Sequence, residues 1–331
     1  MALMPRESGE LIAKLAQNVF IEEEGVKKVA GIIFNVVKND MPHYFSSEMH
    51  PTPDHPRAVD WIFVQDILNF CFWPAQWKVE SYGGYFGLCK ALKRAVEREG
   101  KPIVDPAYYS KITRSELKHI LRGDNPNVKI PLLDERLKNL WDAGKILLDK
   151  YQGTFVECVK SCDGSAEKLL NLVVNEFESF QDEADYHGHR VGIYKRAQIL
   201  VADIWACFRG QGIGHFHDID YVTMFADYRV PQVLAHFGAL RYNDALTTMI
   251  NKGVELENGS EEEVEIRGCS IECVERIKKE VRELIKQNPT AKVKESDVHS
   301  IIVDYILWDY RRDNAEQVNK TPIHKTRCIY Y

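Results

Sequence analysis

Apolar residues recur with the 3.6-residue period of an α-helix along most of the chain. The clearest amphipathic segments are 11–20, 26–38, 132–151, 166–180 and 195–208, and the last is the most apolar of them. Two further helices are predicted to begin at Ser270 and at Ser296 or Asp297. The pattern therefore predicts an all-α protein.

Shorter signals refine this picture. Thr113-Arg-Ser-Glu116 has the spacing of a capping box and predicts a short helix over 115–121. Strand signals are few, and they predict at most a small hairpin over 254–268. The charged run 257–265 is interpreted as a solvated loop, and the stretch 40–57, with its four prolines, as an ordered loop.

Segment 58–74, AVDWIFVQDILNFCFWP, is apolar almost all round, which is typical of a buried helix. It carries Asp66 and Asn69, which lie three residues apart and so share one face of a helix. Burying an unpaired carboxylate costs several kcal/mol. One interpretation is therefore that Asp66 belongs to a polar network in which it is fully hydrogen-bonded. The other is a face that accepts hydrogen bonds from a guanine-like base. The aromatic residues that would then stack on that base are Phe70, Phe72 and Trp73.

The stretch 224–242, MFADYRVPQVLAHFGALRY, joins two predicted helices through a short polar junction. Asp218 is expected to open the first helix, IDYVTMF, and Pro231 suits the first turn of the second. Asp227 lies at the junction. It is either a helix cap or a salt-bridge partner of Arg229, or it is a carboxylate held ionised at a cleft near a helix N-terminus. The latter suits a reaction that develops positive charge on a sugar ring.

The histidines offer an alternative chemistry. His187-Gly-His189 and His215-Phe-His217-Asp218 are similar to metal-ligand clusters. The pair His217-Asp218 also resembles the dyad of helical metal-dependent phosphohydrolases. Against this, the histidines border glycine-rich loops, where they are exposed without a ligand. We expect no metal at these residues.

Charge and cysteine content narrow the function classes. The chain has 331 residues, 45% of them hydrophobic, which suffices for one large domain or two closely packed lobes. Its net charge of −6 disfavours an extended nucleic-acid partner. The eight cysteines are expected to be reduced and mostly buried. Without a signal peptide or a long apolar run, the sequence predicts a soluble cytoplasmic protein.

Several long motifs resemble one family. YKRAQILVADIW, FADYRVPQVLAHFGALRY, VDWIFVQDILNFCFWP, YGGYFGLCKALKRA and TPIHKTRCIYY are similar to segments of the queuosine salvage proteins, and the resemblance covers essentially the whole chain. It implies a single all-helical domain over 1–331, related to helix–hairpin–helix DNA glycosylases. It also implies hydrolysis of the N-glycosidic bond of queuosine 5′-monophosphate, with release of queuine for reuse in tRNA.

The resemblance also assigns roles to residues. The family's essential carboxylate falls on Asp227 and its essential lysine on Lys195, which would keep Asp227 ionised. Asp227 either attacks C1′ or only stabilises the oxocarbenium-like sugar. No metal or organic cofactor is required.

The remaining candidate residues concern substrate binding. The phosphate candidates are Lys195, Arg229 and the segment His324-Lys-Thr-Arg327, and the tail is expected to pack back on the body. Tyr228 and His50 are further candidate substrate contacts. We expect a monomer that binds a single nucleotide, neither a nucleic-acid duplex nor a membrane. A metal-dependent phosphohydrolase and a non-catalytic queuosine-nucleotide-binding protein remain the alternatives.

Overall fold

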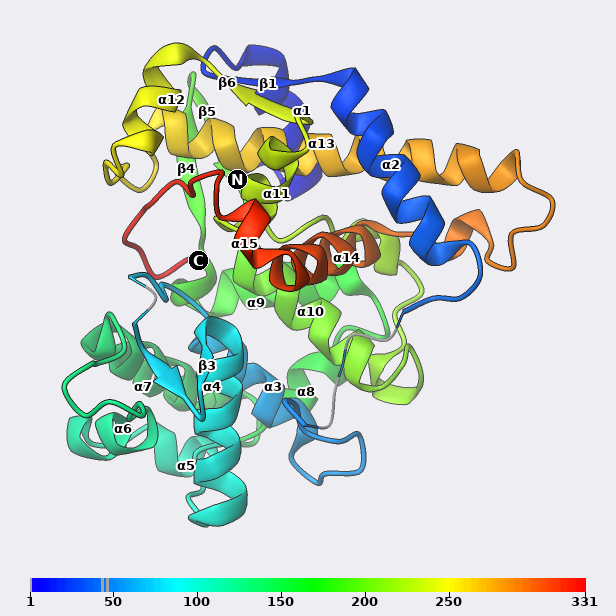
Figure 1. Ribbon diagram of the computed structural model, residues 1–331. Helices are drawn as coiled ribbons and strands as arrows, with labels where there is room; N and C mark the ends of the chain where they lie inside the picture. Colours follow the sequence, from blue (N-terminus) through cyan, green and yellow to red (C-terminus); the bar gives the residue numbers. More distant parts are fainter. Residues whose placement is uncertain (1, 43–44, 46–47, 75) are drawn as a thin grey trace. The chain divides into compact units, whose positions relative to one another are not determined.

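Helices dominate the computed structural model, which describes residues 2–42, 45, 48–74 and 76–331 (Figure 1). These residues form fifteen α-helices and three two-stranded antiparallel sheets. The predicted all-α class is confirmed, whereas the relation to helix–hairpin–helix glycosylases stays a prediction. Part of the predicted loop 40–57, namely residues 43–44 and 46–47, lies outside the described residues.

The described chain divides into two compact units, and helix α10 (Lys195–Cys207) contributes to both. The first unit comprises residues 1–43, 182–198 and 220–327, and the second comprises 44–181, 199–219 and 328–331. The single domain over 1–331 stays a prediction.

In the first unit, α1 (Pro5–Leu15) and α2 (Glu23–Val37) pack on α13 (Glu261–Lys286), the longest described helix (Figure 1). Gly9 of α1 permits this approach, because a Cβ there would lie 2.8 Å from Ile271 Cγ2 of α13. The other helices of this unit are α11 (Val230–His236), α12 (Asp244–Asn251), α14 (Ser300–Asp313) and α15 (Ala315–Val318). Its sheets pair β1 (Val19–Ile21) with β6 (Leu240–Tyr242), and β4 (Glu183–Tyr186) with β5 (His189–Gly192).

The second unit has an aromatic core, in which Phe63 of α3 (Ala58–Ile67) stacks on Phe155 of α8 (Phe155–Lys160) with ring centroids 4.1 Å apart. All ten residues of α3 are buried, as its apolar composition predicts. The other helices are α4 (Gly84–Lys93), α5 (Pro106–Tyr109), α6 (Arg114–Ile120), α7 (Leu133–Lys150) and α9 (Ala166–Glu176). A hairpin of β2 (Lys78–Val79) and β3 (Tyr82–Gly83) and a π-helical turn, Arg94–Arg98, complete this unit's regular structure together with the 3₁₀ turns Glu178–Phe180 and Gly212–Gly214.

Local signals were reliable where the partners are close in sequence. The capping box is confirmed: Thr113 N donates to Glu116 Oε2 at 2.9 Å, and Glu116 N donates to Thr113 Oγ1 at 3.2 Å. Helix α11 begins at Val230 with Pro231 in its first turn. All eight cysteines are free and buried, as expected. Among the described residues, every helix is too short or too polar to span a bilayer.

The predicted hairpin over 254–268 is wrong, because α13 begins at Glu261. Ser270, which was predicted to open a helix, lies inside α13 and donates from Oγ to the carbonyl of Ile266 at 2.6 Å. A serine that binds the preceding turn in this way is accommodated within a helix. Local sequence cannot distinguish that role from a cap.

The charged run 257–265 is not a solvated loop throughout. Glu263 and Glu265 are buried on α13. Each has distant or same-helix partners: Glu263 pairs with Arg267 at 3.1 Å, and Glu265 accepts backbone N–H groups from residues 17–19. These hydrogen bonds offset the cost of burying the carboxylates.

Several helix ends also differ from prediction. Helix α3 ends at Ile67, so Asn69 and the aromatic residues after it lie in an irregular segment and not on a helix face. Helix α1 ends at Leu15 and is followed by β1, and α9 ends at Glu176. Helix α14 begins at Ser300, after a 3₁₀ turn over Glu295–Asp297.

Candidate active site

The carboxylate of Asp227 binds the beginning of α11. Its Oδ1 accepts the backbone N–H of Arg229 at 2.6 Å and that of Val230 at 3.1 Å. Asp227 therefore binds the turn that precedes α11, whose N-cap residue is Arg229, and the predicted salt bridge to Arg229 is not formed, since its guanidinium donates to Gln232 Oε1 at 3.2 Å. Among the described residues, no hydrogen-bond donor reaches Oδ2. Hydrogen bonds thus fix one oxygen of the half-buried carboxylate, Oδ1, whereas Oδ2 accepts none among the described residues.

The segment that leads to Asp227 is irregular, so the predicted helix over 219–225 is wrong. A single 3₁₀ turn, Ile219–Tyr221, is followed by buried, non-helical residues 222–226. Buried backbone groups need partners, and here side chains from three helices supply them. The pairs are Thr223 N to Gln198 Oε1 at 2.8 Å, Phe225 N to Asp304 Oδ2 at 2.9 Å, and Arg267 Nε to the Ala226 carbonyl at 2.8 Å.

Lys195, the second candidate catalytic residue, is the first residue of α10, and only 5% of it is exposed. Its backbone N–H donates to Asp182 Oδ2 at 3.1 Å. Asp182 is itself bound by Arg267, whose Nη1 and Nη2 lie 2.8 and 2.5 Å from the two carboxylate oxygens. Since Arg267 also holds the carbonyl of Ala226, one buried ion pair contacts the backbone at Lys195 and beside Asp227.

The electrostatics around Arg267 are those of a buried cation with two acidic partners. Arg267, Asp182 and Glu263 are all almost fully buried. Burial and the positive charge of Arg267 lower the pKa of His324 to about 3, so this neighbouring histidine is neutral near pH 7. Asp182 and Glu263 therefore have Arg267 as their charged partner, since the neighbouring histidine carries no charge.

A second arginine near Asp227 was missed by sequence reasoning. Burial is the main cause that lowers the pKa of Arg311 to about 10, and repulsion by Arg229 adds to it. Asp227 and Tyr228 act in the opposite direction, which places Arg311 within electrostatic reach of the whole junction. Tyr228 is 7% exposed, and the guanidinium of Arg229 lies 5.2 Å from its ring centroid. The sequence feature that could have indicated Arg311 is the pair Arg311-Arg312 at the end of an aromatic-rich helix.

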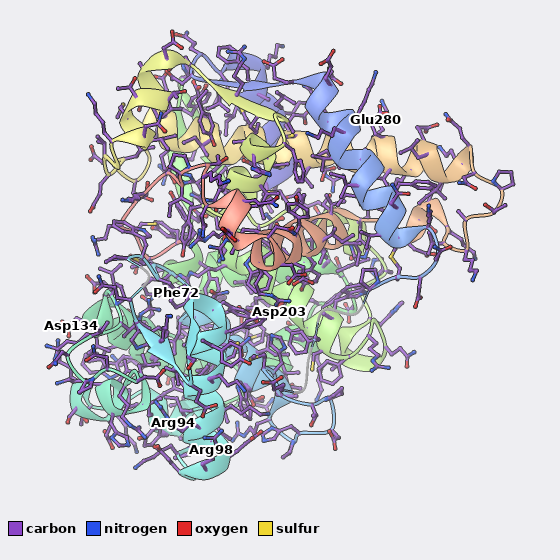
Figure 2. All side chains as sticks on the ribbon, viewed as in Figure 1. Phe72, Arg94, Arg98, Asp134, Asp203 and Glu280 are labelled. Carbon is purple, nitrogen blue, oxygen red and sulfur yellow. The ribbon has the colours of Figure 1, made fainter. Side chains whose placement is uncertain are left out.

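The second unit contains a buried polar cluster that includes His50. Tyr85 donates its hydroxyl proton to Asp203 Oδ2 at 3.1 Å and accepts Gln65 Nε2 at 2.6 Å (Asp203 is labelled in Figure 2). His50 Nε2 lies 3.1 Å from the same hydroxyl oxygen. Because the single phenolic proton goes to Asp203, His50 contributes an N–H from Nε2. Sequence reasoning missed this cluster. The feature that could have indicated it is Asp203, a carboxylate within the apolar segment 195–208.

Asp66 lies near this cluster and is fully buried. Burial raises the pKa of the Cys89 thiol, and the negative charges of Asp203 and Asp66 raise it further. Both carboxylates therefore lie near this thiol. Asn69 Nδ2 donates to Asp66 Oδ1 at 3.4 Å, so these two predicted residues do meet. The structure therefore gathers Asp66, Asn69 and His50 within one unit.

The aromatic residues after α3 have protein partners. Arg136 lies over the ring of Phe70 at 4.2 Å and over that of Phe72 at 5.3 Å, and it donates to the carbonyl of Cys71 at 3.1 Å. Phe72, labelled in Figure 2, is also nearly parallel to Trp77, with ring centroids 6.2 Å apart. Trp73 is 7% exposed. Stacking of a base on this wall stays a prediction.

The C-terminal residues pack on both units, as predicted. Leu256 N donates to the Lys325 carbonyl at 2.7 Å in the first unit, and Cys71 N donates to the Tyr331 carbonyl at 2.8 Å in the second. Arg327 pairs with Glu255 at 3.6 Å, on an exposed surface. That ion pair is the structural alternative to phosphate binding, and the role of Arg327 toward substrate stays a prediction.

The pair His217-Asp218 is occupied by a structural role. Asp218 does not cap the segment that follows it; it accepts the N–H groups of Ala166 and Glu167 at 2.6 and 3.2 Å and so caps α9. Burial acts to raise the pKa of Asp218, but these hydrogen bonds and that from Ser165 leave it lowered. The carboxylate is thus already fully used by the helix.

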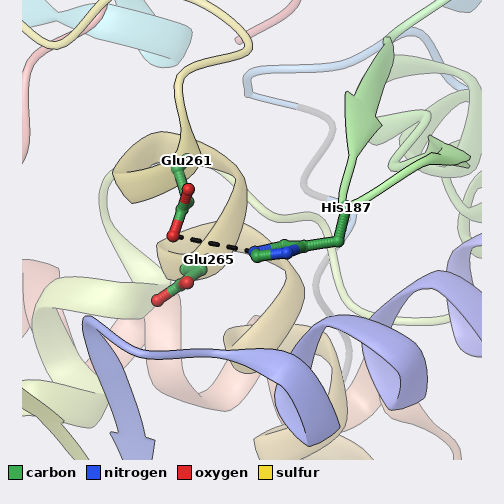
Figure 3. A group of neighbouring side chains, drawn as sticks. All are labelled: His187, Glu261 and Glu265. Carbon is green, nitrogen blue, oxygen red and sulfur yellow. Dashed lines mark ion pairs between the residues drawn. The ribbon is translucent and has the colours of Figure 1, made fainter.

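One other group has the composition of a metal site. Figure 3 shows His187, on the turn between β4 and β5, directed toward Glu261 and Glu265 of α13. His187 Nε2 lies 3.7 Å from Glu261 Oε1. Glu265, however, is bound by the N–H groups of residues 17–19 and by the Tyr186 hydroxyl at 3.0 Å. The group is therefore a structural contact of α13.

Comparison with known proteins decides between the chemistries left open. The family model described as queuosine salvage protein matches residues 49–331. The chain belongs to the queuosine salvage protein family. Relatives named queuosine 5′-phosphate N-glycosylase/hydrolase include proteins from Bos taurus, 44% identical over 99% of both chains, and Mus musculus, 41% identical over 99% of both. A bacterial relative with the same name, from Sphaerobacter thermophilus, is 37% identical over 97% of this chain and 95% of its own.

Membership in the queuosine salvage family agrees with the motifs read from the sequence. The matched range contains the junction around Asp227, Lys195 and the buried segment around Asp66. The family name and the relatives' names leave the role of each residue to be argued from the geometry.

Proposed function

We propose that this protein hydrolyses the N-glycosidic bond of queuosine 5′-phosphate and releases the free base queuine. Its relatives carry the corresponding name over almost their whole length. The observation that carries the assignment of chemistry is the geometry of Asp227, whose Oδ1 is held by two N–H groups while Oδ2 accepts none among the described residues. A carboxylate presented in this way suits a reacting sugar carbon.

The reaction breaks the bond between C1′ and the base nitrogen. The electron pair stays on the nitrogen, which takes up a proton, and a water oxygen finally bonds to C1′. Cleavage leaves positive charge on the sugar, as in glycoside hydrolysis. Asp227 Oδ2 either stabilises that charge or bonds transiently to C1′ before water displaces it. Both routes give the free base and ribose 5-phosphate.

Lys195 supplies positive charge at this site. We assign it to holding Asp227 ionised and to contacting the ribose or phosphate, since opposite charges favour each other's ionised forms. The backbone at Lys195 and the carbonyl of Ala226 are both bound by the Arg267–Asp182 pair. Fixing both segments from one ion pair supports the precise placement that catalysis requires.

Base recognition is assigned to the residues around Asp66. A deazaguanine is a poor leaving group, so its edge must be bound tightly and its nitrogen protonated as the bond breaks. Asp66, Asn69 and His50 are the proposed contacts to that edge, with Phe70, Phe72 and Trp73 as the stacking wall. The Gln65–Tyr85–Asp203 cluster would hold His50 through its Nε2 proton, which leaves Nδ1 as the atom for a contact to the base.

We further propose that the protein acts as a cytoplasmic monomer on a single nucleotide and not on a nucleic-acid duplex. The net charge of −6 supports a small substrate. Eight free, buried thiols support a reducing compartment.

Incubation of the purified protein with queuosine 5′-phosphate, followed by chromatography with and without a chelator, tests the proposal. We expect free queuine in equal amounts under both conditions. Release of inorganic phosphate that the chelator abolishes would point to a metal-dependent phosphohydrolase. Recovery of bound, intact nucleotide would point to a binding protein.

A further inference from the structure

Gln198, on the first turn of α10, is fully buried, and its side-chain amide has a hydrogen-bond partner at every donor and acceptor position. Its Oε1 accepts the backbone N–H of Thr223 at 2.8 Å and the hydroxyl of the same residue at 2.9 Å. Its Nε2 donates to the carbonyls of Ile193 at 3.1 Å and Met224 at 3.4 Å. A backbone N–H can only donate and a carbonyl can only accept, so these partners fix the orientation of the amide.

The amide thereby joins the two segments that carry the proposed catalytic residues. Ile193 lies two residues before Lys195 in the sequence. Thr223 and Met224 lie four and three residues before Asp227. These joined positions belong to neither a helix nor a strand, so no regular ladder of backbone hydrogen bonds holds them in place. The placement of one segment relative to the other therefore depends on side chains that contact both.

The backbone just before Lys195 has a conformation that its sequence does not favour. Tyr194 has a φ of +51°, in the left-handed region that residues with a side chain rarely adopt. Such strain persists only where the surrounding contacts impose it. The Tyr194 hydroxyl donates to Glu183 Oε1 at 2.6 Å, and Gln198 Nε2 binds the carbonyl of the residue before Tyr194. Tertiary contacts thus hold the turn into Lys195, and Gln198 extends this hold to the segment before Asp227.

A neutral amide acts on a reaction chiefly through the position of the groups that it holds. The buried Arg267–Asp182 pair also contacts the backbone of both segments, but it brings charges to the site as well. Gln198 brings none. A displacement of about 1 Å in a catalytic group can cost about 10²-fold in rate, so a contact of this kind is sufficient to affect turnover.

We propose that Gln198 is a positioning residue for the cleavage of the glycosidic bond. It sets the placement of Lys195 relative to Asp227 and acts on the reaction through these two residues. The inference rests on the proposed function and adds to it a residue outside the proposed substrate contacts. Loss of the amide would remove the partner of one buried N–H and of two carbonyls, and both segments would then shift to find others.

The test uses Gln198→Met in the full chain, which keeps the length of the side chain and removes all of its hydrogen bonds. Its matched control is Asn243→Ala, because Asn243 is an amide that joins two other segments. It accepts the N–H of Leu246 at 2.8 Å and donates to Asn18 Oδ1 at 2.8 Å. The measurements are kcat for release of queuine from queuosine 5′-phosphate, the affinity for queuine by calorimetry, and the urea midpoint.

We expect kcat per folded protein to fall at least about tenfold in Gln198→Met and to stay unchanged in Asn243→Ala. The affinity for queuine should stay unchanged in both variants, because the base contacts lie elsewhere. A loss of stability alone would lower the urea midpoint without this separation of kcat from base binding. Equal losses of kcat in the two variants, or a joint loss of kcat and queuine affinity in Gln198→Met, would overturn the proposal.

Gln198→Glu tests the same contact if Gln198→Met does not fold. A carboxylate of the same size still accepts the N–H and the hydroxyl of Thr223, but it cannot donate to both carbonyls of Ile193 and Met224. The same loss of kcat with normal queuine affinity is expected. Release of queuine at the wild-type rate by either folded variant would reject the positioning role alone. If the wild type releases no queuine, the proposed function fails, and the inference fails with it.

Discussion

Arg267 and Asp182 form a buried, two-pronged ion pair, with nitrogen–oxygen distances of 2.8 and 2.5 Å. Arg267 comes from the long helix α13, whereas Asp182 precedes β4. Through this pair the protein holds the N–H of Lys195 and the carbonyl of Ala226. The two proposed catalytic residues are thereby positioned by a contact that touches the backbone of both segments.

Arg267→Met should be strongly destabilising, because it leaves Asp182 buried without its cation. Removing one partner of a buried pair costs about 3–5 kcal/mol. Urea unfolding followed by circular dichroism measures the loss. Arg190→Met is the matched control, since Arg190 is exposed and pairs with Glu183 at 3.0 Å and with the exposed Asp185 at 3.2 Å. A loss under about 1 kcal/mol, typical of surface pairs, would show that the buried pair is not required for stability.

Asp227→Asn should keep the fold and remove the activity. The amide oxygen can still accept the N–H groups of Arg229 and Val230, so the start of α11 is preserved. A neutral group cannot balance the charge on the sugar, so kcat should fall by at least about 10²-fold. Asp185→Asn, at an exposed carboxylate, should keep full activity. Near-normal turnover in Asp227→Asn with a native circular dichroism spectrum would remove Asp227 from the mechanism.

Asp66→Ala should weaken substrate binding more than it lowers the free energy of unfolding. Its loss leaves donors on the base edge unpaired. KM and the affinity for queuine are compared with the urea midpoint. Asn69→Ala removes the amide that binds Asp66 at 3.4 Å and, since Asn69 is itself a proposed base contact, it should also weaken substrate binding. A variant that unfolds while its folded fraction binds substrate normally would favour the structural-network interpretation.

His299 predicts a pH dependence of stability. Burial lowers the pKa of His299 to about 4, from an ordinary value of 6.5. Between these values the unfolded chain binds a proton and the folded chain does not. Stability is therefore complete above about pH 6.5 and falls by about 1.4 kcal/mol per pH unit on acidification, until about pH 4.

His299→Gln should make the pH dependence of unfolding shallower by about that slope between pH 6 and pH 4.5. Urea midpoints at several pH values measure it. His189→Gln, at an exposed position on β5, is the control and should follow the wild type. Parallel curves for wild type and His299→Gln would mean that another group governs acid unfolding.

The sequence by itself determined the features whose physical causes are local. Helical periodicity reports which face of a segment is buried, so the helices over 132–151 and 195–208 were predicted nearly to the residue. The box from Thr113 to Glu116 and the proline in the first turn of α11 depend on residues three apart or fewer. The long motifs around Asp227 and Lys195 identified the family because each motif consists of residues that are consecutive in the sequence.

Tertiary structure decided the features whose partners are distant in sequence. Residues 222–226 have the spacing of a helix but are irregular, and Gln198, Asp304 and Arg267 supply hydrogen bonds to their backbone. Asp218 caps a helix that begins 52 residues before it.

A cavity at the start of α11 likewise exists only in the fold. Its cations come from positions 229, 252 and 325, with Arg311 behind its wall, and each by itself resembles a solvated surface residue in the sequence. These cations come together only because packing brings the start of α11, the end of α12 and the segment after α15 to one cavity. That arrangement is a property of the folded chain, and no window of local sequence contains it.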